Sequence, residues 1–352
     1  MQALTHTLSL ALGLVAMAAP SLEFAEPFAK AADHAAPRQA PAASWNAVTR
    51  YAPQTQSAVS QLSDGTDCVP LSRSAPATAA EPTATPQPGD KGWDERYRGR
   101  ALNLAGSSLE YCERFQRPLS LNGPVLWAKQ HADVGLAKFD SPGGKSYSFS
   151  SGIMKLTAYA EAGSYRGGNV QSTNANQAYQ GQPIVPRTRG FTCAGCYWEA
   201  RIKFPSAYGS WGAFWLLTPD DPRNRGHLEV DVIEYYGIVD RRGHHHATHS
   251  WRNGQNLNMQ NDYTKMDEIG DFGYHTYGVD LRGVAKLDGE PALVIYMDGK
   301  EVGRLAADPK YYSNPFYFLA SLTLNPKESR WTVPQTMEVD YVMAYRPRSG
   351  GR

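Results

Sequence analysis

The sequence lacks the features of several protein classes. No apolar run approaches the ~20 residues that a helix needs to cross a bilayer. The 35 Lys and Arg nearly balance the 34 Asp and Glu, which leaves a formal net charge of +1. The composition therefore gives no indication of a nucleic-acid or membrane-surface binder. Hardly any segment shows the 3.6-residue period of a helix, and the 32 Gly, 24 Pro and 20 Tyr favour turns and strands.

The first hundred residues do not resemble a folded domain. Residues 8–19, LSLALGLVAMAA, have the length of a signal-peptide apolar region, with small-residue cleavage sites at 16–18, near its end, and later at 29–31. A short amphipathic helix is the alternative for this stretch. Residues 32–100 hold segments such as RSAPATAAEPTATPQPGD, which cannot bury enough apolar surface to fold. We expect a signal peptide at 1–31, a low-complexity linker at 32–100, one domain at 101–348, and a secreted or periplasmic protein.

The sequence has four cysteines, which fits an oxidising compartment. Cys193 and Cys196 form CAGC, which can be a redox centre, half of a zinc site or a short disulfide. A zinc site would need a second pair, but Cys68 and Cys112 lie 44 residues apart. A redox centre needs a helix next, whereas YWEARIKFP alternates like a strand. We predict a structural disulfide between Cys193 and Cys196.

From residue 101 the sequence reads as a succession of strands with period two. Asp298-Gly299 is a dipeptide typical of two-residue type I′ hairpin turns. About 250 residues of such strands predict an all-β fold, a two-sheet antiparallel sandwich or jelly roll. The sets predicted to share one face are Trp198, Ala200, Ile202 and Phe204; Trp211, Ala213, Trp215 and Leu217; Phe316, Phe318, Ala320, Leu322 and Leu324; and Met337, Val339, Tyr341, Met343 and Tyr345.

Three acids stand within one strand-like segment, GHLEVDVIEYYG at 226–237. In a regular strand Glu229 and Asp231 share a face, and Glu234 points to the other. An unpaired charge among the Val and Ile of that other face would be costly. One extra residue in a β-bulge between Asp231 and Glu234 returns Glu234 to the first face. We therefore predict a bulge and three carboxylates on one concave sheet face.

Such a group of acids has the chemistry of retaining glycoside hydrolysis. One carboxylate attacks the anomeric carbon, while a second, protonated, gives its proton to the leaving oxygen. Mutual repulsion raises one pKa and keeps that group protonated near neutral pH. A calcium cage or a solvated acidic face is the alternative, but calcium loops are irregular and rich in Asp, Asn and Gly.

These motifs resemble glycoside hydrolase family 16, the laminarinase-type jelly rolls, over residues 101–347. EVDVIE matches the family's E-x-D-x-x-E, and YWEARIKFP, WGAFWLL, FGYHTYGVDL, VIYMDGKEVG and MEVDYVMAY resemble its other strands in the same order. The resemblance implies Glu229 as nucleophile, Glu234 as acid/base and Asp231 as the residue that tunes the nucleophile. It implies no cofactor for the chemistry, but a structural calcium at Glu113 and Asp340.

The resemblance also implies substrate-binding residues, with departures from the pattern. Trp211 and Trp215 are expected either to stack on sugars or to pack in the core, and His249 and Trp251 to lie in the cleft. His227 in PRNRGHLE stands where some members have a sugar-stacking Trp. In RRGHHHATHS, a solvated loop is favoured over a Zn or Cu site, because adjacent strand residues point to opposite faces.

The sequence therefore predicts a monomeric, endo-acting retaining glycosidase. Its polysaccharide is a β-1,3-glucan, a galactan or a bacterial exopolysaccharide, with a charged polymer favoured by the basic segments near the acids. A transglycosylase would use the same three acids, and a lectin-like jelly roll would have lost one of them. A metal-dependent protein built on the histidines would lose its function with a chelator.

Overall fold

The structure is a computed structural model, and it describes residues 99–175, 188–221, 226–237, 243–265 and 272–348. The predicted signal peptide and nearly all of the predicted linker lie outside these residues. All described residues belong to one compact unit, Thr55–Arg352. Within the described part of the chain, no helix has the length and apolar character needed to cross a membrane.

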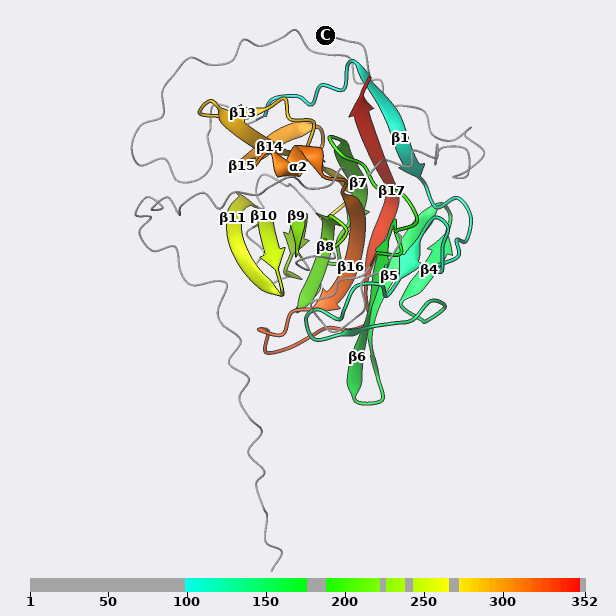
Figure 1. The fold of residues 1–352 in the computed structure, drawn as a ribbon. Coiled ribbons are helices and arrows are strands. Elements are labelled where there is room, and N and C mark those ends of the chain that lie inside the picture. The colour runs from blue at the N-terminus through cyan, green and yellow to red at the C-terminus, as the bar shows by residue number, and fades with distance from the viewer. Residues whose placement is uncertain (1–98, 176–187, 222–225, 238–242, 266–271, 349–352) are drawn as a thin grey trace, which may run out of the picture. The chain divides into compact units, whose positions relative to one another are not determined.

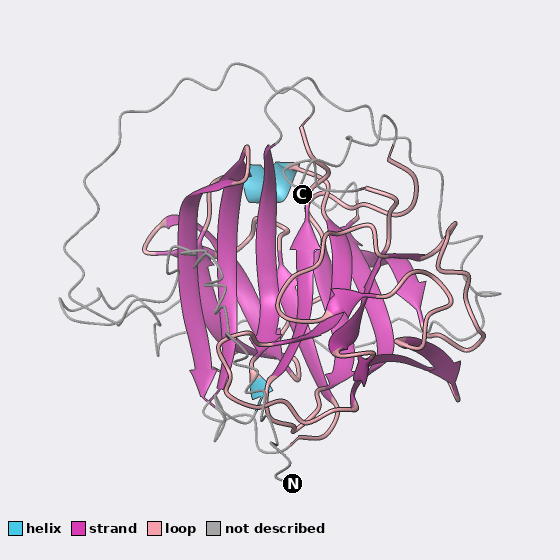
Figure 2. Ribbon diagram, turned by 90° about the horizontal axis from the view of Figure 1, so that it is seen from below, coloured by secondary structure: helices cyan, strands magenta, loops and turns pink. Residues whose placement is uncertain are grey.

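The described strands form two layers, which confirms the predicted all-β sandwich (Figure 1, Figure 2). Sheet I is ordered β4 (Tyr147–Ser150), β5 (Ile153–Glu161), β17 (Gln335–Pro347), β7 (Tyr197–Lys203), β12 (His275–Asp280), β14 (Glu290–Met297) and β15 (Lys300–Ala306). Strand β1 (Ser107–Glu113) pairs with the second half of β17, and β13 (Lys286–Leu287) with β14.

Sheet II carries the acidic segment. Its order is β11 (Gln255–Lys265), β10 (Gly243–Arg252), β9 (Gly226–Tyr235), β8 (Ser210–Leu217), β16 (Tyr317–Leu324), β6 (Ser164–Gln171) and β2 (Trp127–Ala128). Figure 1 shows β11, β10, β9, β8 and β16 following one another across this layer. The β5–β6 hairpin joins the two sheets, and β3 (Lys138–Phe139) pairs in parallel with β6. The short helix α2 (Lys310–Ser313) precedes β16.

The main hydrophobic core lies between the sheets. Alternate residues of β7, β8, β9 and β16 fill it, because successive side chains of a strand point to opposite faces. The sets predicted for YWEARIKFP and PFYFLASLTLN are all in this core: Trp198, Ala200, Ile202 and Phe204, with Phe316, Phe318, Ala320, Leu322 and Leu324. The predicted set on β8 is also confirmed, but it faces away from the core, where Ala213, Trp215 and Leu217 form a separate cluster.

The predicted face of β17 was wrong in its second half. The register against β7 shifts between Val339 and Tyr341, so one extra residue is inserted there. Met337 and Val339 point into the main core, whereas Tyr341 and Met343 belong to a cluster on the outer side of sheet I. After the bulge, the residues that a strict period of two places on the core face point to the outer side of sheet I instead.

Two local predictions are confirmed. Met297 pairs with Lys300 across a two-residue turn, and Asp298 and Gly299 have φ angles of 48° and 71°, as a type I′ turn requires. Cys193 and Cys196 form a disulfide, and the strand β7 follows at once. Cys112 is also disulfide-bonded.

The prediction of a solvated loop for the histidine run was wrong, since residues 243–252 are strand β10. His244 is buried among the rings of Phe204, Tyr235 and Tyr277. Burial lowers the pKa of His244, and it lowers that of His246 to about 4. These two histidines are core residues, because alternation along β10 turns them inward.

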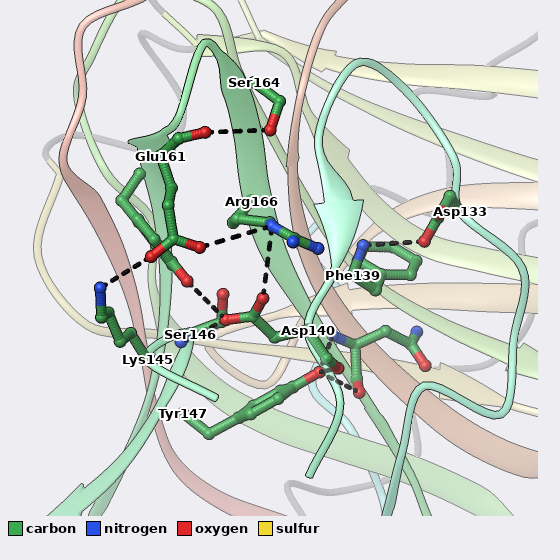
Figure 3. A network of polar contacts seen from close by, with 11 residues as sticks. Asp133, Phe139, Asp140, Lys145, Ser146, Tyr147, Glu161, Ser164 and Arg166 are labelled. Carbon is green, nitrogen blue, oxygen red and sulfur yellow. Dashed lines mark hydrogen bonds and ion pairs between the residues drawn. The ribbon is translucent and has the colours of Figure 1, made fainter. Parts of the chain in front are cut away.

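A polar network holds the segment that runs from β2 to β4 across sheet II (Figure 3). Asp140 accepts hydrogen bonds from the Ser146 amide (3.1 Å) and the Tyr159 hydroxyl (2.8 Å). The Phe139 amide donates to Asp133 at 2.8 Å, which closes the loop between them (Figure 3). The Thr323 hydroxyl donates to the Val134 carbonyl at 2.8 Å, so this loop is fixed over β16.

Candidate active site

The acidic strand contains the predicted bulge. Along β9, Asp231 and Glu234 are three residues apart, but they pair with Trp215 and Ala213 on β8, which are two apart. The register with β10 shifts at the same place. Val232 and Ile233 are both fully buried in the main core, so the extra residue lies on the core side. Glu229, Asp231 and Glu234 therefore share the opposite face of sheet II.

That face holds a cavity of about 250 Å³, lined by all three acids. The other lining residues are His131, Val134, Trp211, Ala213, Trp215, His227, Trp251, Ser321 and Thr323. The predicted residues Trp211, Trp215, His227 and Trp251 are thus brought together beside the acids. His249 reaches them through its contact with Asp231, at 3.1 Å between Nε2 and Oδ2.

Each acid has its own partner from a neighbouring strand. The Trp251 indole N–H donates to Glu229 Oε2 at 2.9 Å. The Trp211 indole N–H donates to Glu234 Oε1, also at 2.9 Å. The two tryptophans therefore act as hydrogen-bond donors to the acids. The sequence predicted only that tryptophans here would stack on sugars, pack in the core or lie in the cleft. Trp215 is buried, and its indole N–H donates to the Ser321 hydroxyl at 3.2 Å.

Burial, and then the charge of Asp231, raise the pKa of both Glu229 and Glu234 to about 8. The charge of Glu234 also raises the Glu229 pKa, because like charges repel. Burial works against a charged His249 ring, but its hydrogen bond to Asp231 and that residue's charge raise the His249 pKa to about 9. The ring is thus a cation at neutral pH and offsets part of the negative charge.

The His249 ring is grouped with two of the three acids. A nitrogen of His249 and one carboxylate oxygen each of Glu229 and Asp231 lie within 4.8 Å of one another. Among the described residues this is the one group of three potential ligand side chains close enough to share a metal ion, and Glu234 is outside it. His249 therefore lowers the pKa of Glu229 more than that of Glu234.

Glu113 and Asp340, the predicted calcium ligands, each have another partner in the structure. Glu113 is buried, and its carboxylate accepts the Phe115 amide at 2.7 Å. Asp340 bonds instead to Arg201 at 2.7 Å. A calcium ion there stays a prediction of the resemblance alone.

Two residues of the site carried no sequence signal. Asp220 is buried, and its Oδ1 lies 2.8 Å from Nδ1 of His227, which is seven residues further along the sequence. His131 packs edge-on against Trp215, with ring centroids 4.8 Å apart, from a loop that is distant in sequence. No spacing pattern marks either one, since both depend on the path of a loop.

The comparisons with known proteins agree with this geometry. Residues 188–342 match the family model for glycosyl hydrolases family 16. No curated protein matches the chain.

Solved structures share the fold at low sequence identity. SCLam, a non-specific endo-beta-1,3(4)-glucanase from family GH16, has 18% identity and a TM-score of 0.54 over 71% of this chain and 96% of its own. A structure of the endo-acting O-glycanases that members of the human gut microbiota express to initiate mucin breakdown has 16% identity and a TM-score of 0.52, over 71% of this chain and 94% of its own. The laminarinase catalytic domain from Thermotoga maritima has 15% identity and a TM-score of 0.50, covering 69% and 99%.

The matched segment 188–342 contains the acidic strand, its bulge and both of its neighbours. Over residues 188–342 the chain matches glycosyl hydrolases family 16, a family of O-glycosyl hydrolases.

Proposed function

We propose that the protein is an endo-acting glycosidase that hydrolyses β-glycosidic bonds within a polysaccharide and retains the anomeric configuration. The observation that carries this proposal is the bulge at Val232, which places Glu229, Asp231 and Glu234 on one cavity-lining face. A retaining enzyme needs one ionised and one protonated carboxyl at roughly 5–5.5 Å.

The surroundings of the acids support one assignment of roles. Glu229 accepts the Trp251 N–H and lies in the group that contains the His249 cation, so its carboxylate is the better stabilised. It is the nucleophile. Glu234 lies outside that group and keeps its proton until the leaving oxygen takes it. Asp231 holds His249 and raises the pKa of both glutamates.

The reaction then has two displacements. Glu229 attacks the anomeric carbon and forms a covalent glycosyl ester, while the Glu234 proton moves to the leaving sugar's oxygen. In the second step Glu234, now ionised, removes a proton from water, and the water oxygen displaces Glu229 from the anomeric carbon. The proton returns to Glu234, and the two inversions give net retention.

Replacement of each glutamate by glutamine tests the roles. Glu234→Gln should lower kcat on polysaccharide by about 10²–10⁴-fold, the usual contribution of a general acid, and Glu229→Gln should abolish turnover. An aryl glycoside with an acidic leaving group should restore the first step in Glu234→Gln but not in Glu229→Gln. Glu338→Gln, an isosteric change in sheet I, is the matched control.

Stereochemistry gives an independent measurement. A 2-fluoro sugar with a good leaving group should label Glu229, and NMR should show the β-anomer forming first. If the α-anomer formed first, the direct-attack mechanism would be wrong.

The polysaccharide is identified by product release from a panel. Proteins of the same fold include a non-specific endo-beta-1,3(4)-glucanase and endo-acting O-glycanases that initiate mucin breakdown. The panel therefore includes laminarin, mixed-linkage glucan, mucin, neutral galactan and sulfated galactan. Export, expected from residues 8–19, would bring the enzyme to such extracellular polymers. Addition of acceptor sugars distinguishes hydrolysis from transglycosylation, because a transglycosylase gives longer products.

A further inference from the structure

One buried ionisable pair has no part in the two displacements. Asp220 lies in the loop before β9, and His227 is the second residue of that strand. Their side chains are 2% and 1% exposed, with Oδ1 and Nδ1 2.8 Å apart. Polar groups buried this deeply are costly unless they are paired. This pair satisfies that condition inside the cavity wall, two residues before Glu229.

The pair leads to the nucleophile through one tryptophan. His227 and Trp251 are register partners on β9 and β10. Their rings lie at 26° with centroids 6.1 Å apart, within the range of offset stacking. The same indole lies at 23° and 5.6 Å from the His249 ring. Its N–H donates to Glu229 Oε2.

The indole thus packs near two imidazoles, and each imidazole is bonded to an aspartate. His227 is bonded to Asp220, and His249 to Asp231. An aspartate fixes the orientation of an imidazole plane, and the planes of the two rings fix that of the indole. The direction of the Trp251 N–H is therefore set by its contacts with His227 and His249.

We propose that Asp220 and His227 are positioning residues for the reaction, which hold Trp251 so that its indole N–H orients the nucleophile Glu229. The inference rests on the proposed function, because it takes Glu229 as the nucleophile. A donor aimed at a carboxylate favours the ionised form, and a fixed carboxylate has the geometry for attack before the substrate arrives. His227 acts only through Trp251 in this arrangement.

The groups that face the Glu229 carboxylate come from three elements. Asp231 and Glu234 on β9 oppose its ionisation, and His249 and Trp251 on β10 favour it. Tyr311 of α2 is also near enough for the Glu229 charge to affect it. Loss of the Trp251 donor should therefore raise the Glu229 pKa, with the other four groups left in place.

Two variants test separately the hydrogen bond from Trp251 to Glu229 and the contact of His227 with Trp251. Trp251→Phe keeps a ring but removes the N–H, and should lower kcat/KM by about ten- to hundredfold, the value of a hydrogen bond to a charged group. His227→Asn keeps a donor for Asp220 but removes the ring beside the indole. It should lower kcat in the same direction with little change in KM, and move the acidic limb of the pH profile upward. His275→Ala, which removes a histidine bonded to Asp298 at 2.7 Å in sheet I, is the control.

The double variant is the decisive measurement. If His227 acts through the Trp251 N–H, His227→Asn should add no further loss of kcat in the Trp251→Phe background. The indole N–H signal of Trp251 in the NMR spectrum of His227→Asn should also lose protection from hydrogen exchange, which reports the same link without activity.

The opposing outcomes differ. A rise in KM alone that persists in the Trp251→Phe background would show direct sugar contact by His227 and overturn the proposal. A fall in melting temperature with kcat and the acidic limb unchanged would show a purely structural pair and overturn it too. Labelling of a residue other than Glu229 by the fluorosugar would overturn the proposed roles themselves, a result separate from either.

Discussion

The hydrogen bond from Trp211 to Glu234 allows the roles of the two glutamates to be tested by pH. Trp211→Phe keeps an aromatic ring in the cavity wall and removes the N–H that lies 2.9 Å from Glu234 Oε1. A hydrogen bond to a charged group contributes about 1.5–3 kcal/mol, which corresponds to roughly one to two pKa units. Tyr236 also bonds to Glu234 and remains in the variant. We therefore expect the Glu234 pKa to rise by about one unit.

The direction of the effect depends on the role of Glu234. As the general acid it must be protonated, so the basic limb of the kcat/KM profile should move to higher pH by about one unit. The acidic limb should stay in place. The assay is kcat/KM between pH 4 and 10 at constant ionic strength. Trp331→Phe, which removes an indole N–H bonded to the Asn325 carbonyl outside the cavity, is the control. If the acidic limb moved instead, Glu234 would be the nucleophile and the assignment would be reversed.

Three further results are expected. Asp231→Asn should slow catalysis less than either glutamate variant and should lower the His249 pKa seen by NMR, because Asp231 is what raises it; an unchanged titration would contradict the pairing. The folded protein holds His244 uncharged, so its contribution to stability is complete above the unfolded pKa of about 6.5 and is lost as pH falls below it. His244→Phe should therefore reduce the loss of unfolding free energy between pH 6.5 and 4, and an equal loss in both proteins would refute this. Removal of residues 1–98 should leave an active domain with a lower melting temperature, because it takes away the only remaining cysteine with which Cys112 can form its disulfide. Removal of 1–106 should lower the melting temperature further, because Leu102 and Leu104 pack on the outer side of sheet I.

The sequence predicts which face of a strand points into the core wherever the wrong choice would bury a charged side chain. The bulge in β9 followed from the cost of placing Glu234 among the core side chains. The bulge in β17 has no such signal, because Met, Val and Tyr fit either side of sheet I equally well. The histidine run was misread for a similar reason, since His244 is buried uncharged and a charge rule does not apply to it.

The three acids could be recognised in the sequence because they lie within a stretch of six residues. Their partners were harder to place. Trp211 and Trp251 were recognisable as cleft residues, but whether a ring presents its face or its N–H depends on cross-strand register. Asp220 and His131 reach the site by loops, and the path of a loop is not encoded in a period of two or 3.6.

The bulge has a consequence for how related chains are recognised. On both neighbouring strands the partners of Asp231 and Glu234 are two residues apart, so a chain with Val232 deleted could keep Trp215, Ala213 and His245 opposite the same acids. Such a chain would read E-V-D-I-E and present its three acids to the same side without any insertion. The arrangement of acids is thus compatible with two chain lengths that differ by one residue. A motif search restricted to E-x-D-x-x-E would miss every chain that uses the shorter one.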